Sequence, residues 1–192
     1  MTSSRIDQQV AFLTEADQLK LVDRATSLTD ASRRENSAKH SWHVALYALI
    51  LADQAHPDVD ISRVIKMLLN RDLVEIDAGD APIFGKYDAD KLAQEEATAA
   101  TRIFGLLPPD QACELRQLWN EFEAATSPDA QFAKSMDRFQ PPNQNLASGG
   151  GTWTEYNVTL DQIETRVGSK IARGAPALWH WLKPLIKSVL GP

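Results

Sequence analysis

The sequence predicts an all-α fold, a single helical domain that spans residues 1–192. Nearly every apolar pattern repeats with the helical period of about 3.6 residues, and no segment shows a convincing strand-like alternation. Residues typical of helix caps precede the periodic segments, and glycine or proline follows several of them. A length of 192 residues is typical of one domain with its own core.

The first two helices are predicted in the N-terminal quarter of the chain. The first has apolar residues at helical spacing, namely Phe12, Ala16, Leu19 and Val22. The second follows the capping residues Asn36 and Ser37. It carries the stripe Trp42, Ala45, Leu46 and Leu49, and its other sides are also apolar. A helix of this kind is usually central in the core.

Four more helices are expected at residues 61–79, at 89–104, from 109 onward and from 128 onward. Asp60 is the predicted N-cap of the first of them. Ser127 and Pro128 suit the cap and first position of the last. Pro141 and Pro142 are expected to end that helix, because an interior proline removes a backbone hydrogen bond.

The glycine-rich stretch at residues 143–152 is predicted to be a flexible loop within the domain, because the remaining chain is too short to fold alone. Thr159 and Gln162 resemble a capping box that begins a seventh helix. The last helix is expected near residues 176–190, with a kink at Pro184.

Composition excludes several classes of function. The net charge of −6 argues against an extended nucleic-acid surface or a polybasic membrane patch, so an anionic ligand must be held by a small local group of cations. The single cysteine, Cys113, excludes an intrachain disulfide and favours a reducing compartment. No window approaches the ~20 apolar residues of a membrane span. We therefore expect a cytoplasmic protein with a small-molecule ligand.

The helix predicted at residues 61–79 carries the clearest candidate site. Its apolar stripe, which includes Ile65 and Leu68, continues along the same face to Asp72 and Glu75. Burying a carboxylate without a partner costs several kcal/mol, so these side chains must meet cations, a metal ion or hydrogen-bond donors. An internal ion-pair network with Arg71, or simply an exposed helix end, explains the pattern equally well.

Three other groups of residues have both a functional and a structural explanation. His40 and His43 lie one turn apart and could contribute to a metal site, or they could be one core and one surface histidine. Asp137 by itself is typical of a solvated helix position. The upstream cations could clamp a phosphate or simply lie in water, and they are Arg24, Arg33, Arg34 and Lys39.

In chain order, three segments resemble one family, the HD-domain phosphohydrolases of the 5′-deoxynucleotidase branch. Residues 33–43, RRENSAKHSWH, resemble its R-x-E-N-x-A-E-H-S-W motif. Residues 68–80, LLNRDLVEIDAGD, resemble L-L-x-H-D-L-V-E-I-D-A-G-D, and residues 133–141, AKSMDRFQP, are similar to A-K-A-x-D-R-x-Q-P. The resemblance extends over residues 8–188 and implies a helical HD-domain bundle.

The resemblance also implies a chemistry and a set of site residues. Members of the family bind one divalent transition metal, of the Co, Mn, Zn or Fe type, through two histidines and two aspartates. They hydrolyse (deoxy)nucleoside 5′-monophosphates and are commonly homodimers. His40, Asp72 and Asp137 match metal ligands, Glu75 matches the acid that handles the attacking water and leaving group, Asp80 matches the sugar contact, and Arg24 and Arg33 match phosphate contacts.

The chain departs from the family motif at a metal ligand, and Lys39 also replaces an acid beside His40. Arg71 stands where the family has the fourth metal ligand, a histidine, and a guanidinium group has no lone pair to offer a metal. Three readings follow from this substitution. The chain could be a hydrolase that binds metal weakly, or a metal-free binding protein in which Arg71 pairs with Asp72 and Asp137. It could also use Glu75 and Asp80 for a different acid–base reaction.

Overall fold

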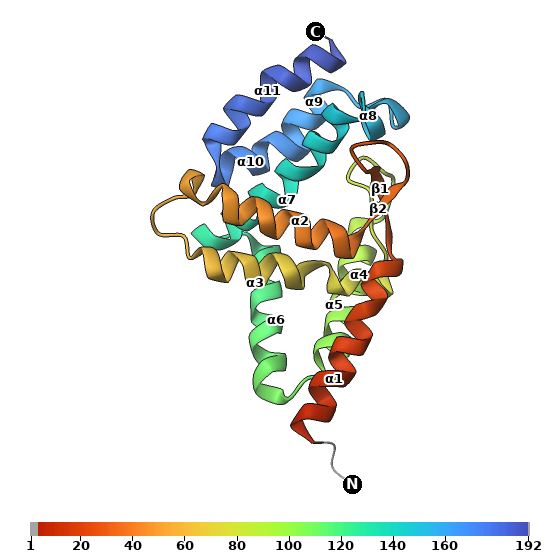
Figure 1. Ribbon diagram of the computed structural model, residues 1–192, viewed down its shortest axis with the longest axis vertical. Helices are drawn as coiled ribbons and strands as arrows, with labels where there is room; N and C mark the ends of the chain where they lie inside the picture. The colour runs from red at the N-terminus through yellow and green to blue at the C-terminus, as the bar shows by residue number, and fades with distance from the viewer. Residues whose placement is uncertain (1–3, 192) are drawn as a thin grey trace.

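A computed structural model describes residues 4–191, and its regular structure is almost entirely helical (Figure 1). This confirms the predicted all-α class. The helices are α1 (Arg5–Ala16), α2 (Ser37–Ile50), α3 (Ile61–Arg71), α4 (Glu75–Ala78), α5 (Ala89–Phe104), α6 (Pro109–Ala124), α7 (Pro128–Ala147), α8 (Gly151–Glu155), α9 (Leu160–Ile163), α10 (Ser169–Gly174) and α11 (Pro176–Leu190). Within residues 4–191, no helix combines the length and the apolar character that a membrane crossing needs.

Helix α7 is central to the packing and contacts α2, α3, α6, α10 and α11. The larger cluster of buried apolar side chains surrounds it and includes Val44, Met67, Phe132 and Met136. A second cluster, which includes Phe12, Ile103 and Trp119, packs where α1, α5 and α6 meet. Figure 1 shows α2 and α3 crossing the middle of the molecule between these two regions.

A short β-hairpin corrects the expectation that the chain has no strand. Strands β1 (Asp23–Ser27) and β2 (Arg34–Asn36) pair antiparallel between α1 and α2. Five and three residues are too few for an apolar–polar alternation to stand out in the sequence. Asp30 stabilises the turn between the strands by accepting hydrogen bonds from the backbone N–H and hydroxyl of Ser32.

Helix α7 does not end at its prolines, as the sequence predicted. It continues through Pro141 and Pro142 to Ala147, and α8 begins at Gly151, so residues 148–150 are the irregular part of the expected loop. Each proline removes one backbone donor from the helix. The helix nevertheless continues because this part of it is packed in the core, where Gln140, Pro142, Gln144 and Asn145 are buried.

The predicted helix at residues 61–79 is interrupted, and the second predicted helix is buried on one face, against α3 and α7. Helix α3 ends at Arg71, a 3₁₀ turn covers Asp72–Val74, and α4 follows. On α2, three of the four residues of the expected stripe face outward, and only Ala45 is buried. Trp42 is 62% exposed and Leu49 is 55% exposed. The buried face of α2 carries His40, Ser41, Val44, Ala45 and Ala48.

Candidate functional site

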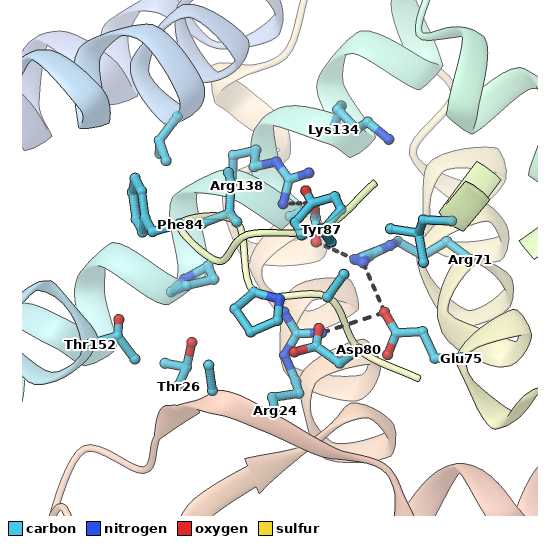
Figure 2. Close-up of a pocket in the computed structure, with 18 of the residues that line it drawn as sticks. Arg24, Thr26, Arg71, Glu75, Asp80, Phe84, Tyr87, Lys134, Arg138 and Thr152 are labelled. Atoms are coloured by element: carbon cyan, nitrogen blue, oxygen red, sulfur yellow. Dashed lines mark hydrogen bonds and ion pairs between the residues drawn. The ribbon is translucent and has the colours of Figure 1, made fainter. Parts of the chain in front are cut away.

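A cavity of about 310 Å³ opens between β1, the end of α3, α4, the loop at residues 79–88 and α7, with α5, α6 and α8 completing its walls. Figure 2 shows that charged side chains from these separate elements point into it. Arg24 comes from the hairpin, Arg71 and Glu75 come from α3 and α4, and Asp137 and Arg138 come from α7. The cavity therefore joins residues that lie more than 100 positions apart.

The guanidinium group of Arg71 lies among three buried carboxylates. Its Nη2 atom is 2.5 Å from Asp72 Oδ1 and 3.7 Å from Glu75 Oε1. Its Nη1 atom donates a hydrogen bond to Asp137 Oδ1. Burial alone lowers the pKa of Arg71, but the carboxylates of Asp137, Asp72 and Glu75 outweigh it and raise that pKa. Arg71 is therefore a permanent positive charge in this cluster.

His40 is fully buried and contacts the same oxygen of Asp137 as Arg71, with its Nε2 atom 3.5 Å from Arg71 Nη1. Its Nε2 atom is 3.1 Å from Asp137 Oδ1, and its Nδ1 atom is 2.9 Å from Gln140 Oε1 and 3.5 Å from Glu35 Oε2. These contacts orient the imidazole ring toward Arg71 and Asp137.

The carboxylate of Asp72 is held by a neighbour on α2 as well as by Arg71. Ser41 donates a 2.5 Å hydrogen bond to Asp72 Oδ2. Burial by itself raises the pKa of Asp72, but the charges of Arg71, His40 and Arg24 together outweigh it, so the pKa lies below its usual value. Asp72 is therefore ionised in the folded protein at neutral pH.

A second group of charges centres on Arg24, which is 9% exposed. Its Nη1 atom is 3.0 Å from Asp80 Oδ1 and 3.7 Å from Glu75 Oε1. Ser37 donates a 2.5 Å hydrogen bond to Glu75 Oε2. Burial, with the nearby negative charge of Asp72, raises the pKa of Glu75 well above its usual value.

The structure brings together most of the residues that the sequence singled out. The group comprises His40, Asp72, Glu75, Asp80, Asp137 and Arg24. Arg33 is not part of it, because it is exposed on the hairpin and its Nη1 atom donates to the backbone carbonyl of Arg34. His43 contacts Gln140 and lies outside the cavity.

Sequence reasoning missed two cations that line the cavity, Lys134 and Arg138. Both lie on α7 close to Asp137, at positions 134 and 138, and both fall within the third segment of the resemblance. Their proximity to a carboxylate of the candidate site was the only available signal. Sequence reasoning also missed Glu35, which is buried beside His40 and lies in the first segment of the resemblance.

The side chains as arranged do not fit a divalent metal ion. The guanidinium of Arg71 contacts both aspartates that would ligate it, and an arginine offers no lone pair. Across the described part of the chain, no three or more His, Cys, Asp and Glu side chains form a group that could hold a metal ion.

Comparisons with known proteins agree with this fold. The HD domain family model matches residues 16–179. Human 5′-deoxynucleotidase HDDC2 is 29% identical over 128 residues, which cover 66% of this chain and 61% of the human protein. The zebrafish protein of the same name is 30% identical over 137 residues, which cover 70% of this chain and 66% of that protein. The matched part is thus less than two thirds of the length of these relatives.

Solved structures resemble the whole chain. The crystal structure of a predicted metal-dependent phosphohydrolase from Magnetospirillum magnetotacticum MS-1 is 45% identical with a TM-score of 0.92, and the match covers 97% of this chain and 93% of that one. The PH0347 protein from Pyrococcus horikoshii OT3 shares the fold, with a TM-score of 0.65 at 22% identity, covering 92% of this chain and 99% of that one. The family model alone covers more than half of the sequence. This chain belongs to the HD-domain family.

Proposed function

We propose that this chain binds a small phosphomonoester, of the (deoxy)nucleoside 5′-monophosphate class, in the cavity of Figure 2 without a metal ion. The same proposal holds that metal-dependent hydrolysis of phosphomonoesters by this chain is impaired. One observation carries it, namely that the Arg71 guanidinium contacts Asp72 and Asp137, the two aspartates that the resemblance assigns to the metal. Arg71 then supplies positive charge where the family uses a divalent cation.

Electrostatics supports a metal-free site. At an effective dielectric constant of ~20, a divalent ion ~5 Å from a guanidinium group is opposed by roughly 7 kcal/mol. That repulsion offsets much of the binding that the remaining ligands His40, Asp72 and Asp137 could supply. Arg71 has little room to move away, because its side chain is only 12% exposed and lies 5.3 Å above the ring of Phe122.

The size and lining of the cavity support a small phosphorylated ligand. A volume of about 310 Å³ lies at the lower end of the range for small-molecule sites. Arg24, Arg71, Lys134 and Arg138 line it, and guanidinium groups bind phosphate oxygens through paired hydrogen bonds. The names of the human and zebrafish relatives, 5′-deoxynucleotidases, suggest a nucleoside monophosphate as the ligand.

Three measurements on the purified protein test this proposal together. Elemental analysis gives the metal content, phosphate release from deoxynucleoside monophosphates with added cobalt or manganese gives the activity, and calorimetry in a chelator gives ligand binding. We expect less than stoichiometric metal, little or no phosphate release, and binding that persists in the chelator. Stoichiometric metal with turnover would overturn the metal-free site.

A phosphomonoester hydrolase is the second candidate, and Glu75 is the observation that favours it. This carboxyl lines the cavity, and burial raises its pKa well above the usual value, a shift that suits a group passing a proton to a leaving oxygen. Phosphate release that Glu75→Gln abolishes, in a variant that still binds the ligand, would support this candidate.

We also propose that the chain is a cytoplasmic homodimer. The single cysteine fits a reducing compartment. Exposed apolar side chains on α2 and α11, among them Trp42, Ile50 and Trp181, form a surface that a second copy could cover.

A further inference from the structure

The four cations that line the cavity differ in how many carboxylates they contact. Arg71 contacts Asp72, Asp137 and Glu75. Arg24 lies within 4.0 Å of Glu35, Glu75 and Asp80. Both side chains are about nine-tenths buried. Arg71 donates a hydrogen bond to Asp137, whereas Nε and Nη1 of Arg24 are buried among three carboxylates without a hydrogen-bond partner in the described part of the chain.

Lys134 is also committed to protein groups. Its Nζ atom lies 3.2 and 3.3 Å from the two carboxylate oxygens of Glu123 and 3.9 Å from the centre of the Phe122 ring. Burial lowers the pKa of Lys134.

Arg138 is the exception. Its only ion pair within residues 4–191 joins Nη1 to Asp137 Oδ2 at 3.4 Å, which is longer than a normal hydrogen bond. The structure gives its side chain no hydrogen bond in this part of the chain, although the side chain is 30% exposed and lines the cavity. Figure 2 shows the guanidinium projecting into the cavity from α7, on the same side as Phe84 of the 79–88 loop.

We infer that Arg138 is the residue that binds the anionic group of the ligand, a phosphate monoester, through its guanidinium N–H groups. This inference rests on the proposed function and names the phosphate-binding residue of that same site. Arg138 faces a single carboxylate at 3.4 Å, so a phosphate can bind it without displacing a shorter contact. Arg24 and Arg71 each lie among three carboxylates, whose negative charges oppose the approach of a phosphate. Arg138 therefore takes the role that the resemblance gives to Arg33, which is outside the cavity.

Calorimetric titration in a chelator tests the inference, with a deoxynucleoside monophosphate and inorganic phosphate as probes. We compare the wild type with Arg138→Gln and Arg138→Lys, and use Arg173→Gln on the exposed surface of α10 as the matched control. Loss of a charge-assisted contact should weaken binding of both probes about 10-fold or more in Arg138→Gln. Arg138→Lys should recover part of this loss, because it keeps the charge but not the paired geometry. Arg173→Gln should bind like the wild type.

The outcomes separate this inference from the proposed function. If the wild type binds and Arg138→Gln binds equally well, or if Arg33→Gln alone weakens binding, the inference is overturned and the proposed function stands. If the wild type binds neither probe, both are overturned. Should Arg138→Gln fail to fold, the Arg138 Nε–H resonance of the wild type decides, assigned by its loss in Arg138→Lys. We expect this resonance to shift on phosphate addition, and an unmoved resonance at saturation would overturn the inference.

Discussion

Arg71 is the residue at which this chain departs from the motif that it otherwise resembles, and its contacts explain how the fold tolerates the change. A buried carboxylate needs a positive partner or a proton. Asp72 and Asp137 both contact the Arg71 guanidinium. Burial raises the pKa of Asp137, but Arg71, Arg138 and His40 together outweigh it, so this pKa lies well below its usual value. One arginine thus neutralises carboxylates that a metal ion could otherwise hold.

Replacing Arg71 with the histidine of the family motif tests this explanation at the site. We expect Arg71→His to raise the affinity for divalent metal and to increase phosphate release from nucleoside monophosphates, because the variant restores a fourth ligand and removes a repelling charge. Isothermal titration with manganese and a phosphate-release assay measure both effects. Arg71→Gln is the control, since it removes the charge without adding a ligand. A folded Arg71→His protein that gains neither property would show that the carried-over site assignment is wrong.

Removal of the Arg71 charge should also lower stability. In Arg71→Gln the buried carboxylates of Asp72 and Asp137 lose their partner, and breaking a buried ion pair in this way costs about 3–5 kcal/mol. Urea denaturation of the wild type and the variant at neutral pH measures the difference. A loss below about 1 kcal/mol would mean that these carboxylates are neutralised by other groups.

Glu75 should make the free energy of unfolding decrease as pH rises. Burial raises its pKa in the folded protein well above the usual value of 4.5, so the folded state holds this proton more tightly than the unfolded state. The contribution of Glu75 to the free energy of unfolding is therefore greatest below pH 4.5 and is lost as pH rises through the folded pKa. Urea denaturation between pH 5 and 8 should show the wild type losing stability relative to Glu75→Gln. Parallel pH profiles would contradict the shift.

At the scale of elements, local signals account well for where helices begin, and they fail for the ends of α3 and α7. Helices α5 and α11 have the predicted bounds, and the capping box of Thr159 and Gln162 begins α9 as expected. Cap residues act within one turn, so the sequence around them is sufficient. The end of α7 depends on burial of its last turns, which no local pattern contains.

A substitution at the N-cap of α3 should lower the stability of the protein without changing ligand binding. Asp60 accepts hydrogen bonds from the backbone N–H groups of Ser62 and Arg63, at the end of the helix away from Arg71. We expect Asp60→Ala to lower the free energy of unfolding by about 1 kcal/mol, with unchanged ligand affinity. Asp53→Ala, at an exposed position, should change stability by less than about 0.5 kcal/mol. Weaker ligand binding in Asp60→Ala would show that the cap also positions the site.

At the scale of the whole molecule, one apolar face has no partner within the described chain. A groove of about 590 Å³ lies between α2, α7 and α11 and includes Leu46, Ile50 and Trp181. Ile50 is 69% exposed and Trp181 is 54% exposed, and they lie beside the other outward-facing apolar residues of α2. Exposed apolar surface of this kind often marks a protein interface, which is why we propose a homodimer.

The proposed dimer makes a prediction for solution mass. Analytical ultracentrifugation should give a dimer for the wild type and a monomer for Ile50→Glu, because a charge buried in an apolar interface is unfavourable. Ile6→Glu is the matched control, since Ile6 is 70% exposed on α1, away from this face, and should leave the dimer intact. A monomeric wild type at tens of micromolar would contradict the proposal.

The sequence by itself determined the helical class, most helix starts and the need for cations, a metal ion or hydrogen-bond donors at Asp72 and Glu75 if they are buried. Periodicity, caps and the cost of burying a charge are local or compositional properties. Only the tertiary structure decided which cations meet these carboxylates. Arg24 reaches Glu75 from a hairpin too short to recognise in the sequence, and Arg71 reaches Asp137 across 66 positions. It also decided that α7 runs through two prolines and that α2 turns its tryptophan outward. Such outcomes depend on the packing of distant segments, whose energy can outweigh any local preference.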